Sequence, residues 1–134
     1  MKKLRVRSDK VAEAPPGLWS NCLKVGRTVY VAGLTARGPD GKSVVGSNEY
    51  DQAKVVFQKI KDLVCAAGGS MDDIVKLTIY VTDVKKNAEV WRARSEFFAG
   101  DFPTCALVQV AALAIPELLI EIESVAYIGC SSDS

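Results

Sequence analysis

The sequence contains no histidine, and this absence excludes more function classes than any other feature of its composition. Histidine is the usual general base near neutral pH and the commonest metal ligand in proteins. Catalytic machinery of the Ser-His-Asp or Cys-His kind is therefore excluded, and we expect neither a metal ion nor another cofactor.

Cysteine is scarce and widely spaced, and no C-x-x-C pair occurs among Cys22, Cys65, Cys105 and Cys130. A zinc or redox site of that type is not expected, and the pattern favours reduced thiols in a cytoplasmic protein. Long apolar runs are missing too, because none approaches the ~20 residues that span a bilayer. Charge rather than an apolar segment follows Met1, so we expect no export signal and no membrane partner.

An excess of charge of one sign is also absent, since 17 basic and 16 acidic residues leave a net charge of +1. The single basic cluster (Lys2, Lys3, Arg5, Arg7) is followed by Asp9 and Glu13, and we interpret it as a solvated edge rather than a nucleic-acid site. The 134 residues are 49% hydrophobic and 25% charged, as in ordinary globular proteins. We expect one domain over residues 1–134.

The spacing of apolar residues predicts an α+β fold with the element order β-β-α-β-α-β-β. Strands are expected as a hairpin-like pair within 22–34 and at 75–82, 105–111 and 118–128, and helices at 50–67 and 90–98, with the longest loop at 36–48. Two amphipathic helices can cover only one face of a four- or five-stranded sheet.

The last two expected strands are apolar on both faces, because Leu107 and Val108 alternate in one and Leu119 and Ile120 in the other. A monomer with so large an apolar face would be prone to aggregate. We therefore expect a homo-oligomer in which the sheets pack inward.

A series of short motifs follows along nearly the whole chain: Gly17-Leu18-Trp19-Ser20-Asn21, Val31-Ala32-Gly33-Leu34, Ala66-Ala67-Gly68, Asp73-Ile74-Val75-Lys76, Phe97-Phe98, Phe102-Pro103-Thr104-Cys105 and Ile120-Glu121-Ile122-Glu123. In this order the motifs resemble the RidA (YjgF-type) imine deaminase family. The resemblance implies a homotrimer of chorismate-mutase-like α+β subunits, with sites in the clefts between neighbours. It also implies hydrolysis of a 2-imino acid to a 2-keto acid and ammonia.

In active members of that family, an arginine after F-P-A binds the substrate carboxylate, and a glutamate of the last strand positions the water. Here the glutamate is Glu121, whereas the arginine position is Cys105. The tyrosine position is Trp19, the serine of S-G-Q is Ala32, and the asparagine of the helix is Trp91. A thiol cannot replace a bidentate, charged clamp, so we expect a divergent member that binds small 2-imino acids poorly.

Glu121 is the candidate catalytic residue, because a carboxylate can position water or shuttle a proton when burial raises its pKa. The alternative is a strand glutamate that faces solvent or pairs with a lysine. We take Glu123, on the same strand face, as structural. Cys105 lacks a nearby group that would activate its thiol, so we expect it to line the pocket as a small apolar side chain rather than as a nucleophile.

The substrate-binding candidates are chosen for size and charge. Trp19 and Trp91 offer surfaces for a planar ligand, although Trp91 fits equally well in the core. Arg37 is our preferred cation because it lies in the long loop, and Arg92 and Arg94 are alternatives that, like Arg37, are more often solvated charges. Ala32 and Gly33 are expected to line the same cleft, and the amides near Cys105 and Ala106 to stabilise developing negative charge.

The family resemblance thus favours an enzyme that hydrolyses or tautomerises an imine, an enamine or a related small metabolite, and we expect a bulky or aromatic-derived one. The alternative is a non-catalytic trimer that binds small ligands or acts as a chaperone-like or regulatory protein, because most of the expected catalytic groups are replaced. A ribonuclease is opposed by the near-neutral charge and the lack of histidine.

Overall fold

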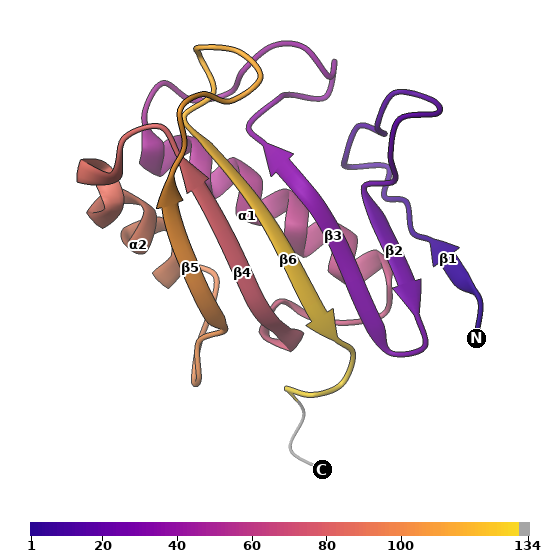
Figure 1. Cartoon of the computed structure of the whole chain (residues 1–134). Helices are drawn as coiled ribbons and strands as arrows, with labels where there is room; N and C mark the ends of the chain where they lie inside the picture. The colour runs from indigo at the N-terminus through magenta and orange to yellow at the C-terminus, as the bar shows by residue number, and fades with distance from the viewer. Residues whose placement is uncertain (132–134) are drawn as a thin grey trace.

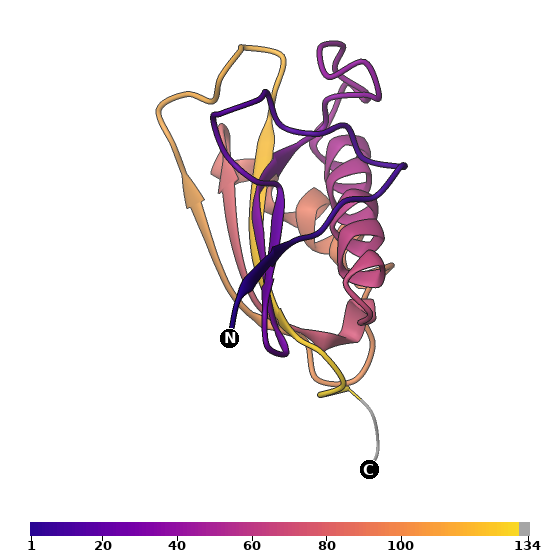
Figure 2. The same cartoon turned by 90° about the vertical axis from the view of Figure 1, so that its right-hand side faces the viewer.

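The computed structural model describes residues 1–131 and shows a mixed sheet with both α-helices on one face (Figures 1 and 2). The strands are β1 (Lys3–Arg5), β2 (Cys22–Val25), β3 (Thr28–Thr35), β4 (Ile74–Val81), β5 (Thr104–Gln109) and β6 (Ile120–Tyr127). The helices are α1 (Glu49–Ala66) and α2 (Asn87–Ser95), each separated from a neighbouring strand by a 3-10 turn, at Met71–Asp73 and at Val84–Lys86. The last three residues of the expected domain, 132–134, lie outside the described part.

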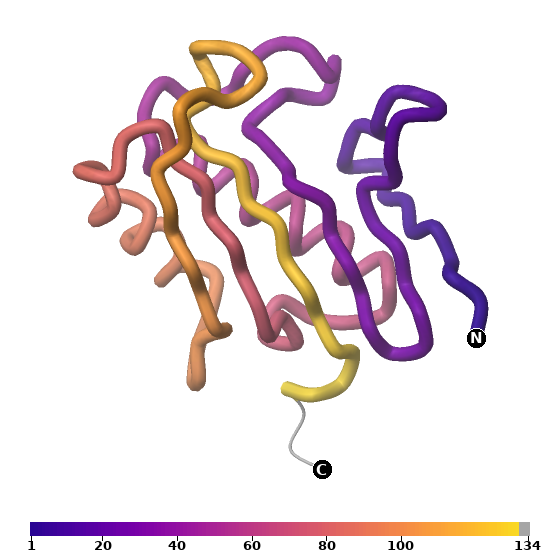
Figure 3. The backbone as a smooth tube through the Cα atoms, in the orientation of Figure 1, coloured from indigo at the N-terminus to yellow at the C-terminus, as the bar shows by residue number. Residues whose placement is uncertain are grey.

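The strands lie in the order β1-β2-β3-β6-β4-β5, so β6 is inserted between β3 and β4 (Figure 3). All neighbouring pairs are antiparallel except β4 and β5, which are parallel and are connected through α2. The expected α+β fold is confirmed. This order leaves β5 as one edge of the sheet, with unpaired backbone groups on its outer side.

The expected element order is wrong at the N-terminus, where β1 adds a strand. Lys3–Arg5 pairs with β2 although it has no apolar alternation, which is why the sequence pattern missed it. Arg5 and Arg7 both contact the Glu13 carboxylate, at 3.0 and 3.2 Å. The basic cluster is therefore an edge strand whose charge is partly neutralised.

Helix α1 begins one residue before the expected start, because the Asn48 side chain caps it by accepting a hydrogen bond from the Asp51 amide at 2.8 Å. It ends before Gly68, whose φ of 98° suits glycine. Its apolar stripe packs on the sheet, with Phe57 and Ile60 fully buried. No helix within residues 1–131 has both the length and the apolar character needed to cross a membrane.

Helix α2 begins and ends three residues earlier than its apolar stripe suggested. It ends at Ser95, and Phe97 and Phe98 lie in the following turn. Both rings pack against Phe57 of α1, with centroids 5.5 and 5.9 Å away. The helical spacing of these aromatics therefore reflects their contact with α1 and not a continuation of α2.

The last two strands are shorter than expected, and apolar side chains do not fill both of their faces. Leu119 precedes β6, whose buried side chains alternate with Glu121 and Glu123. The face without helices, called the open face below, thus carries carboxylates beside exposed apolar side chains such as Val108 and Tyr127. The open face is the one turned away from the helices in Figure 2. Oligomerisation through it stays a prediction.

Candidate functional site

A cavity of about 390 Å³ lies between the N-terminal segment and the end of β3, and it gathers four of the candidates from the sequence. These are Trp19, Gly33, Arg37 and Glu121. The remaining walls are formed by Val11, Ala12, Glu13, Ala14, Pro15, Asn21, Leu34, Thr35, Gly38, Gly41, Lys59, Ala114 and Leu118. We call this space the Glu121 cavity.

The Glu121 carboxylate lies directly over Gly33. Glu121 pairs with Thr35 of β3, beside the irregularity in strand register between Val31 and Leu34. A Cβ atom on Gly33 would lie only 2.6 Å from Glu121 Oε2. A glycine is therefore needed here so that the carboxylate can approach the backbone of β3.

The environment of Glu121 favours its protonated form. Burial, followed by the negative charge of Glu123, raises the pKa of Glu121 above its ordinary value. A carboxyl group with a raised pKa can both accept and return a proton nearer to neutral pH. Glu123 itself accepts a hydrogen bond from the Tyr80 hydroxyl at 2.9 Å, which gives it a partner within the sheet.

Positive charge lies on another wall of the Glu121 cavity. The Lys59 ammonium donates a hydrogen bond to the Thr35 carbonyl at 2.7 Å. Burial and the nearby charge of Arg37 lower the pKa of Lys59. Lys59 was not identified from the sequence, because a lysine within a helix is usually solvated. Lys59 follows the buried Val56 by three residues and precedes the buried Leu63 by four, and this spacing places it on the inner side of the helix.

Trp19 is held at the cavity by a chain of hydrogen bonds. Its indole Nε1 donates to Asn21 Oδ1 at 3.3 Å, and the buried Asn21 amide donates to the Ala12 carbonyl at 2.9 Å. The Trp19 side chain remains 51% exposed. It therefore offers an accessible aromatic surface beside Glu121.

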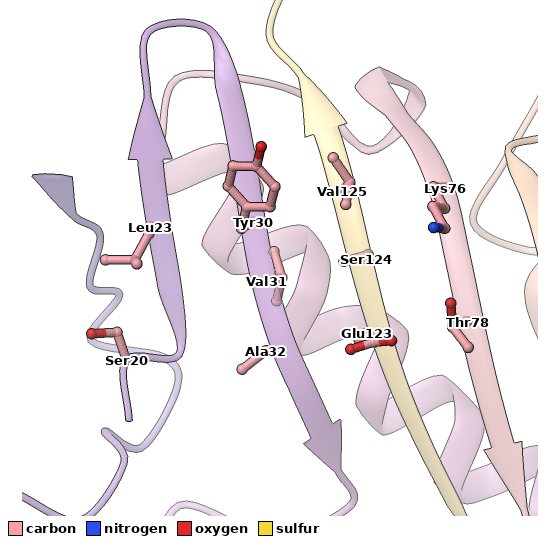
Figure 4. A pocket seen from close by; sticks show the side chains of 10 residues that line it. All are labelled: Ser20, Leu23, Tyr30, Val31, Ala32, Lys76, Thr78, Glu123, Ser124 and Val125. Atoms are coloured by element: carbon pink, nitrogen blue, oxygen red, sulfur yellow. The ribbon is translucent and has the colours of Figure 1, made fainter. Parts of the chain in front are cut away.

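Ala32 lies in a neighbouring pocket of about 320 Å³ on the open face (Figure 4). Side chains of β3, β6 and β4 surround it, among them Tyr30, Glu123, Lys76 and Thr78. Because Ala32 precedes Gly33 and Glu123 shares a strand face with Glu121, this pocket extends along the same side of the sheet as the Glu121 carboxylate.

The other candidates, Cys105, Ala106 and Trp91, line neither of these spaces within one copy. Cys105 and Ala106 lie on the edge strand β5, opposite Leu77 and Thr78 of β4. Trp91 lies on α2 and packs against the core. In a single copy, Trp19 therefore lines the Glu121 cavity whereas Trp91 does not.

The Cys105 thiol is not activated by its surroundings. Partial burial raises its pKa, and the charge and hydrogen bonding of the neighbouring Arg94 guanidinium only partly oppose this rise. A thiol with a raised pKa is mainly protonated near neutral pH and is a poor nucleophile. The environment of Cys105 thus favours a packing role.

The remaining cysteines offer no site. Burial raises the pKa of Cys22 to about 11, whereas Cys65 and Cys130 are exposed, and all of these thiols are free. Cys65 is exposed because it lies on the outer side of α1. Within residues 1–131, no three His, Cys, Asp or Glu side chains form a group able to hold a metal ion.

Residues 10–128 match the model of a protein family described as Endoribonuclease L-PSP. A RutC family protein of Pyrococcus abyssi is 34% identical over 116 residues, which are 87% of this chain and 91% of that protein. A 2-iminobutanoate/2-iminopropanoate deaminase of Dermatophagoides farinae is 31% identical over 96% of this chain and 99% of its own length. A crystal structure of RidA from the Antarctic bacterium Psychrobacter sp. superposes with a TM-score of 0.84 at 36% identity, covering 93% of this chain and 99% of that one.

Proposed function

The chain belongs to the Endoribonuclease L-PSP family, also known as the RidA/YjgF family, and from this premise we propose that it hydrolyses or tautomerises the C=N bond of a small imine or enamine. The observation that carries the proposal is the half-buried Glu121 carboxylate, which lies over Gly33 in an open cavity. Its surroundings raise the pKa of this carboxyl group. The relative named as an iminobutanoate deaminase supports the same reaction class.

In the proposed hydrolysis, Glu121 holds a water molecule and accepts its proton while the water oxygen bonds to the imine carbon. The electron pair of the C=N double bond moves to nitrogen, which takes up the proton that Glu121 accepted. In the resulting carbinolamine, Glu121 carries the hydroxyl proton to the nitrogen as the C–N bond breaks, so that ammonia leaves and a carbonyl product remains. Amides near Cys105 and Ala106 on the outer edge of β5 stabilise negative charge that develops on the substrate.

The proposed site is a cleft between copies of a homotrimer. In one copy, the Glu121 cavity and the Cys105 region are separate. One copy would supply Glu121 with its surrounding residues Trp19, Ala32, Gly33 and Arg37. The next copy would supply Cys105, Ala106 and Trp91. The open face and the unpaired edge of β5 offer surfaces for such packing.

The proposed substrate is bulkier than a small 2-imino acid and is partly aromatic or apolar. Cys105 leaves space where a family arginine would lie, and the exposed Trp19 ring offers a stacking surface. The proposed setting is the cytoplasm, where the free thiols of the four cysteines would stay reduced.

A non-catalytic, ligand-binding or chaperone-like trimer is the alternative function. The replacements at Trp19, Ala32 and Cys105 favour it, because each removes a group that the family resemblance assigns to the site. The family description also names an endoribonuclease. A net charge of +1 gives little attraction for the phosphate backbone of RNA, so we do not favour that activity.

The test is the rate at which imines, produced in place by an amino-acid oxidase, are converted to keto acid and ammonia. We expect the unmodified protein to accelerate conversion of aromatic imino acids more than small ones, and Glu121→Gln to lower this rate about 100-fold or more. Glu117→Gln, an exposed glutamate nearby, is the matched control and should keep full activity. Full activity in Glu121→Gln would contradict the mechanism, and no activity in the unmodified protein would favour the binding alternative.

The Cys105→Arg variant tests the substrate assignment separately. A guanidinium at this position would restore a bidentate partner for a carboxylate. We expect the variant to gain activity toward small 2-imino acids while keeping its dependence on Glu121. Unchanged substrate preference would contradict the role that we assign to Cys105.

A further inference from the structure

We propose that Arg94 is the carboxylate-binding residue of the cleft, supplied from α2 in place of the arginine that is missing at Cys105. This inference rests on the proposed function, and it names the substrate class as an organic acid with a planar or apolar body. The preferred cation from the sequence was Arg37, which lies in the Glu121 cavity instead.

Two aromatic side chains hold the Arg94 guanidinium in place. Its carbon Cζ lies 4.3 Å from the centre of the Trp91 ring and 5.2 Å from the centre of the Phe102 ring. Trp91 precedes Arg94 by nearly one turn of α2, and Phe102 lies just before β5. Contacts between a guanidinium and aromatic faces fix the plane of the cation and leave its N–H edge free to bind an anion.

Arg94 has no acidic partner within residues 1–131. It takes part in none of the ion pairs found there, and its buried Nε atom has no hydrogen-bond partner. The buried Nε is out of reach of a ligand, so a carboxylate from outside the chain would bind the terminal nitrogens of the guanidinium, whose charge no acidic side chain balances.

Other arginines are already engaged. Arg92 on the same helix donates to the Glu89 carboxylate at 2.7 Å, and Arg27 donates to the Ile128 carbonyl at 2.6 and 2.9 Å. Arg5 and Arg7 contact Glu13. Arg27 and Arg92 also lie over tyrosine rings, so Arg94 differs from them in having, within residues 1–131, no carboxylate or carbonyl partner, only the neighbouring Cys105 thiol.

Arg94 is also adjacent to the position that matters for substrate binding. Its charge and hydrogen bonding act on the Cys105 thiol, which lies on the neighbouring edge strand. The Cys105 side chain is shorter than the arginine that the family resemblance places at this position. A carboxylate bound there would meet the two N–H groups of a planar fork, and its apolar body would lie near the Trp91 and Phe102 rings.

The experiment compares binding of phenylpyruvate with binding of its uncharged amide, by titration calorimetry on the intact oligomer. Both are stable analogues of the carbonyl product, so the measurement does not depend on turnover. We expect the unmodified protein to bind the acid at least tenfold more tightly than the amide. Arg94→Gln should abolish this preference, and Arg92→Gln, which removes the same charge from the same helix, should preserve it.

A second variant separates binding from packing. Adding Cys105→Arg to Arg94→Gln returns a guanidinium to the same region and should restore the preference for the acid, which a purely structural defect would not allow. Equal affinity of the unmodified protein for acid and amide, or no binding of either, would overturn the proposal whether or not the variants fold. Loss of the preference in Arg37→Gln but not in Arg94→Gln would overturn it in favour of Arg37.

The same titrations distinguish this proposal from the proposed function. If Arg94 binds the acid but Glu121→Gln leaves imine hydrolysis unchanged, the catalytic assignment fails and the carboxylate site stands. If hydrolysis depends on Glu121 but acid and amide bind equally, the catalytic assignment stands and Arg94 is not the clamp. If the true partner of Arg94 is an acidic side chain of a neighbouring copy, Arg94→Gln should change the mass of the oligomer without changing the preference for the acid. This result too would overturn the proposal.

Discussion

At the scale of single residues, the chemistry of the site depends on how two carboxylates share one strand face. Glu121 is half-buried over Gly33, whereas Glu123 is exposed and bonded to Tyr80. The negative charge of Glu123 contributes to the raised pKa of Glu121. Glu123 therefore tunes the proton affinity of the candidate catalytic group without facing the same cavity.

We expect Glu123→Gln to lower the pKa of Glu121, because the substitution removes a like charge but keeps the size of the side chain. The acid limb of the activity profile should then move to lower pH. Carboxyl ¹³C NMR titration measures the pKa directly, with Glu117→Gln as a control that should leave it unchanged. A Glu121 pKa that stays the same or rises in Glu123→Gln would contradict this coupling.

Asp73 is a second carboxylate whose surroundings have the opposite effect. Burial alone would raise its pKa, but hydrogen bonds from Ser131, Gly129 and Ser70 outweigh it and hold the pKa at about 2. The Ser131 hydroxyl lies 2.7 Å and the Ser70 amide 2.9 Å from the carboxylate. These contacts fasten the end of the chain after β6 to the turn before β4.

We expect Asp73→Asn to reduce the free energy of unfolding by about 1–3 kcal/mol at neutral pH, as for buried hydrogen bonds to a charged group. Because the pKa of Asp73 is lower in the folded state, its charge stabilises the fold at pH values above the unfolded pKa of about 3.9. This stabilisation is lost as pH falls toward about 2. Urea denaturation between pH 7 and about 2 should therefore show the two proteins converging at the acid end. A difference that is constant with pH would contradict the role of the charge.

At the scale of elements, α1 is fixed to two loops by the buried side chain of Gln52. Its Nε2 donates to the carbonyls of Gly46 and Glu117 at 3.1 and 2.8 Å, and its Oε1 accepts from the Leu119 amide at 2.9 Å. These bonds connect the loop before α1 with the segment before β6. They thereby help to position Glu121, which follows two residues after Leu119.

We expect Gln52→Leu to lower the free energy of unfolding by roughly 1–3 kcal/mol, because the buried backbone groups lose their partners. Gln58→Leu, at an exposed position of the same helix, is the matched control and should change it by no more than about 0.5 kcal/mol. Chemical denaturation of both variants provides the comparison. An equal effect of the two substitutions would show that the Gln52 bonds do not stabilise the fold.

The elements that could be predicted from the sequence are those with strong periodicity, such as α1 and β4, whose bounds agree to within one residue. Strand β1 could not, because its pairing with β2 depends on contacts and not on alternation. The end of α2 was misplaced since Phe97 and Phe98 keep a helical spacing while they pack on α1.

The candidate site was predictable only in part for a similar reason. The motifs pointed to Trp19, Gly33 and Glu121, and the fold brings these around one cavity. Lys59 acquires its environment from a distant partner, the Thr35 carbonyl, and Arg94 acquires part of its environment from the Phe102 ring beyond the end of α2. No local pattern in the sequence shows such contacts.

At the scale of the whole molecule, the helices cover one face of the sheet and leave the open face and the β5 edge without cover (Figure 2). The open face includes the apolar Val108 and Tyr127 beside charged side chains. Such a mixed surface is suited to an interface with polar contacts, and our proposal of a homotrimer uses it in this way.

We expect light scattering to give three times the chain mass of 14.4 kDa. Val108→Asp should shift the population toward monomer, because it places a charge on the open face. Val84→Asp is the matched control, since Val84 has similar exposure, 41% against 43%, but lies outside the sheet. A monomer of 14.4 kDa in the unmodified protein would contradict the proposal.

The measurement that tests the central claim most directly is complementation between two inactive variants. Glu121→Gln removes the proposed catalytic group, and Cys105→Phe blocks the part of the cleft that the neighbouring copy supplies. After the two proteins are mixed under exchanging conditions, about a quarter of the clefts in random trimers would unite an intact Glu121 with an intact Cys105. We expect imine hydrolysis to recover to about that fraction of the unmodified rate, whereas a mixture as inactive as its components would contradict a Glu121-dependent site shared between copies.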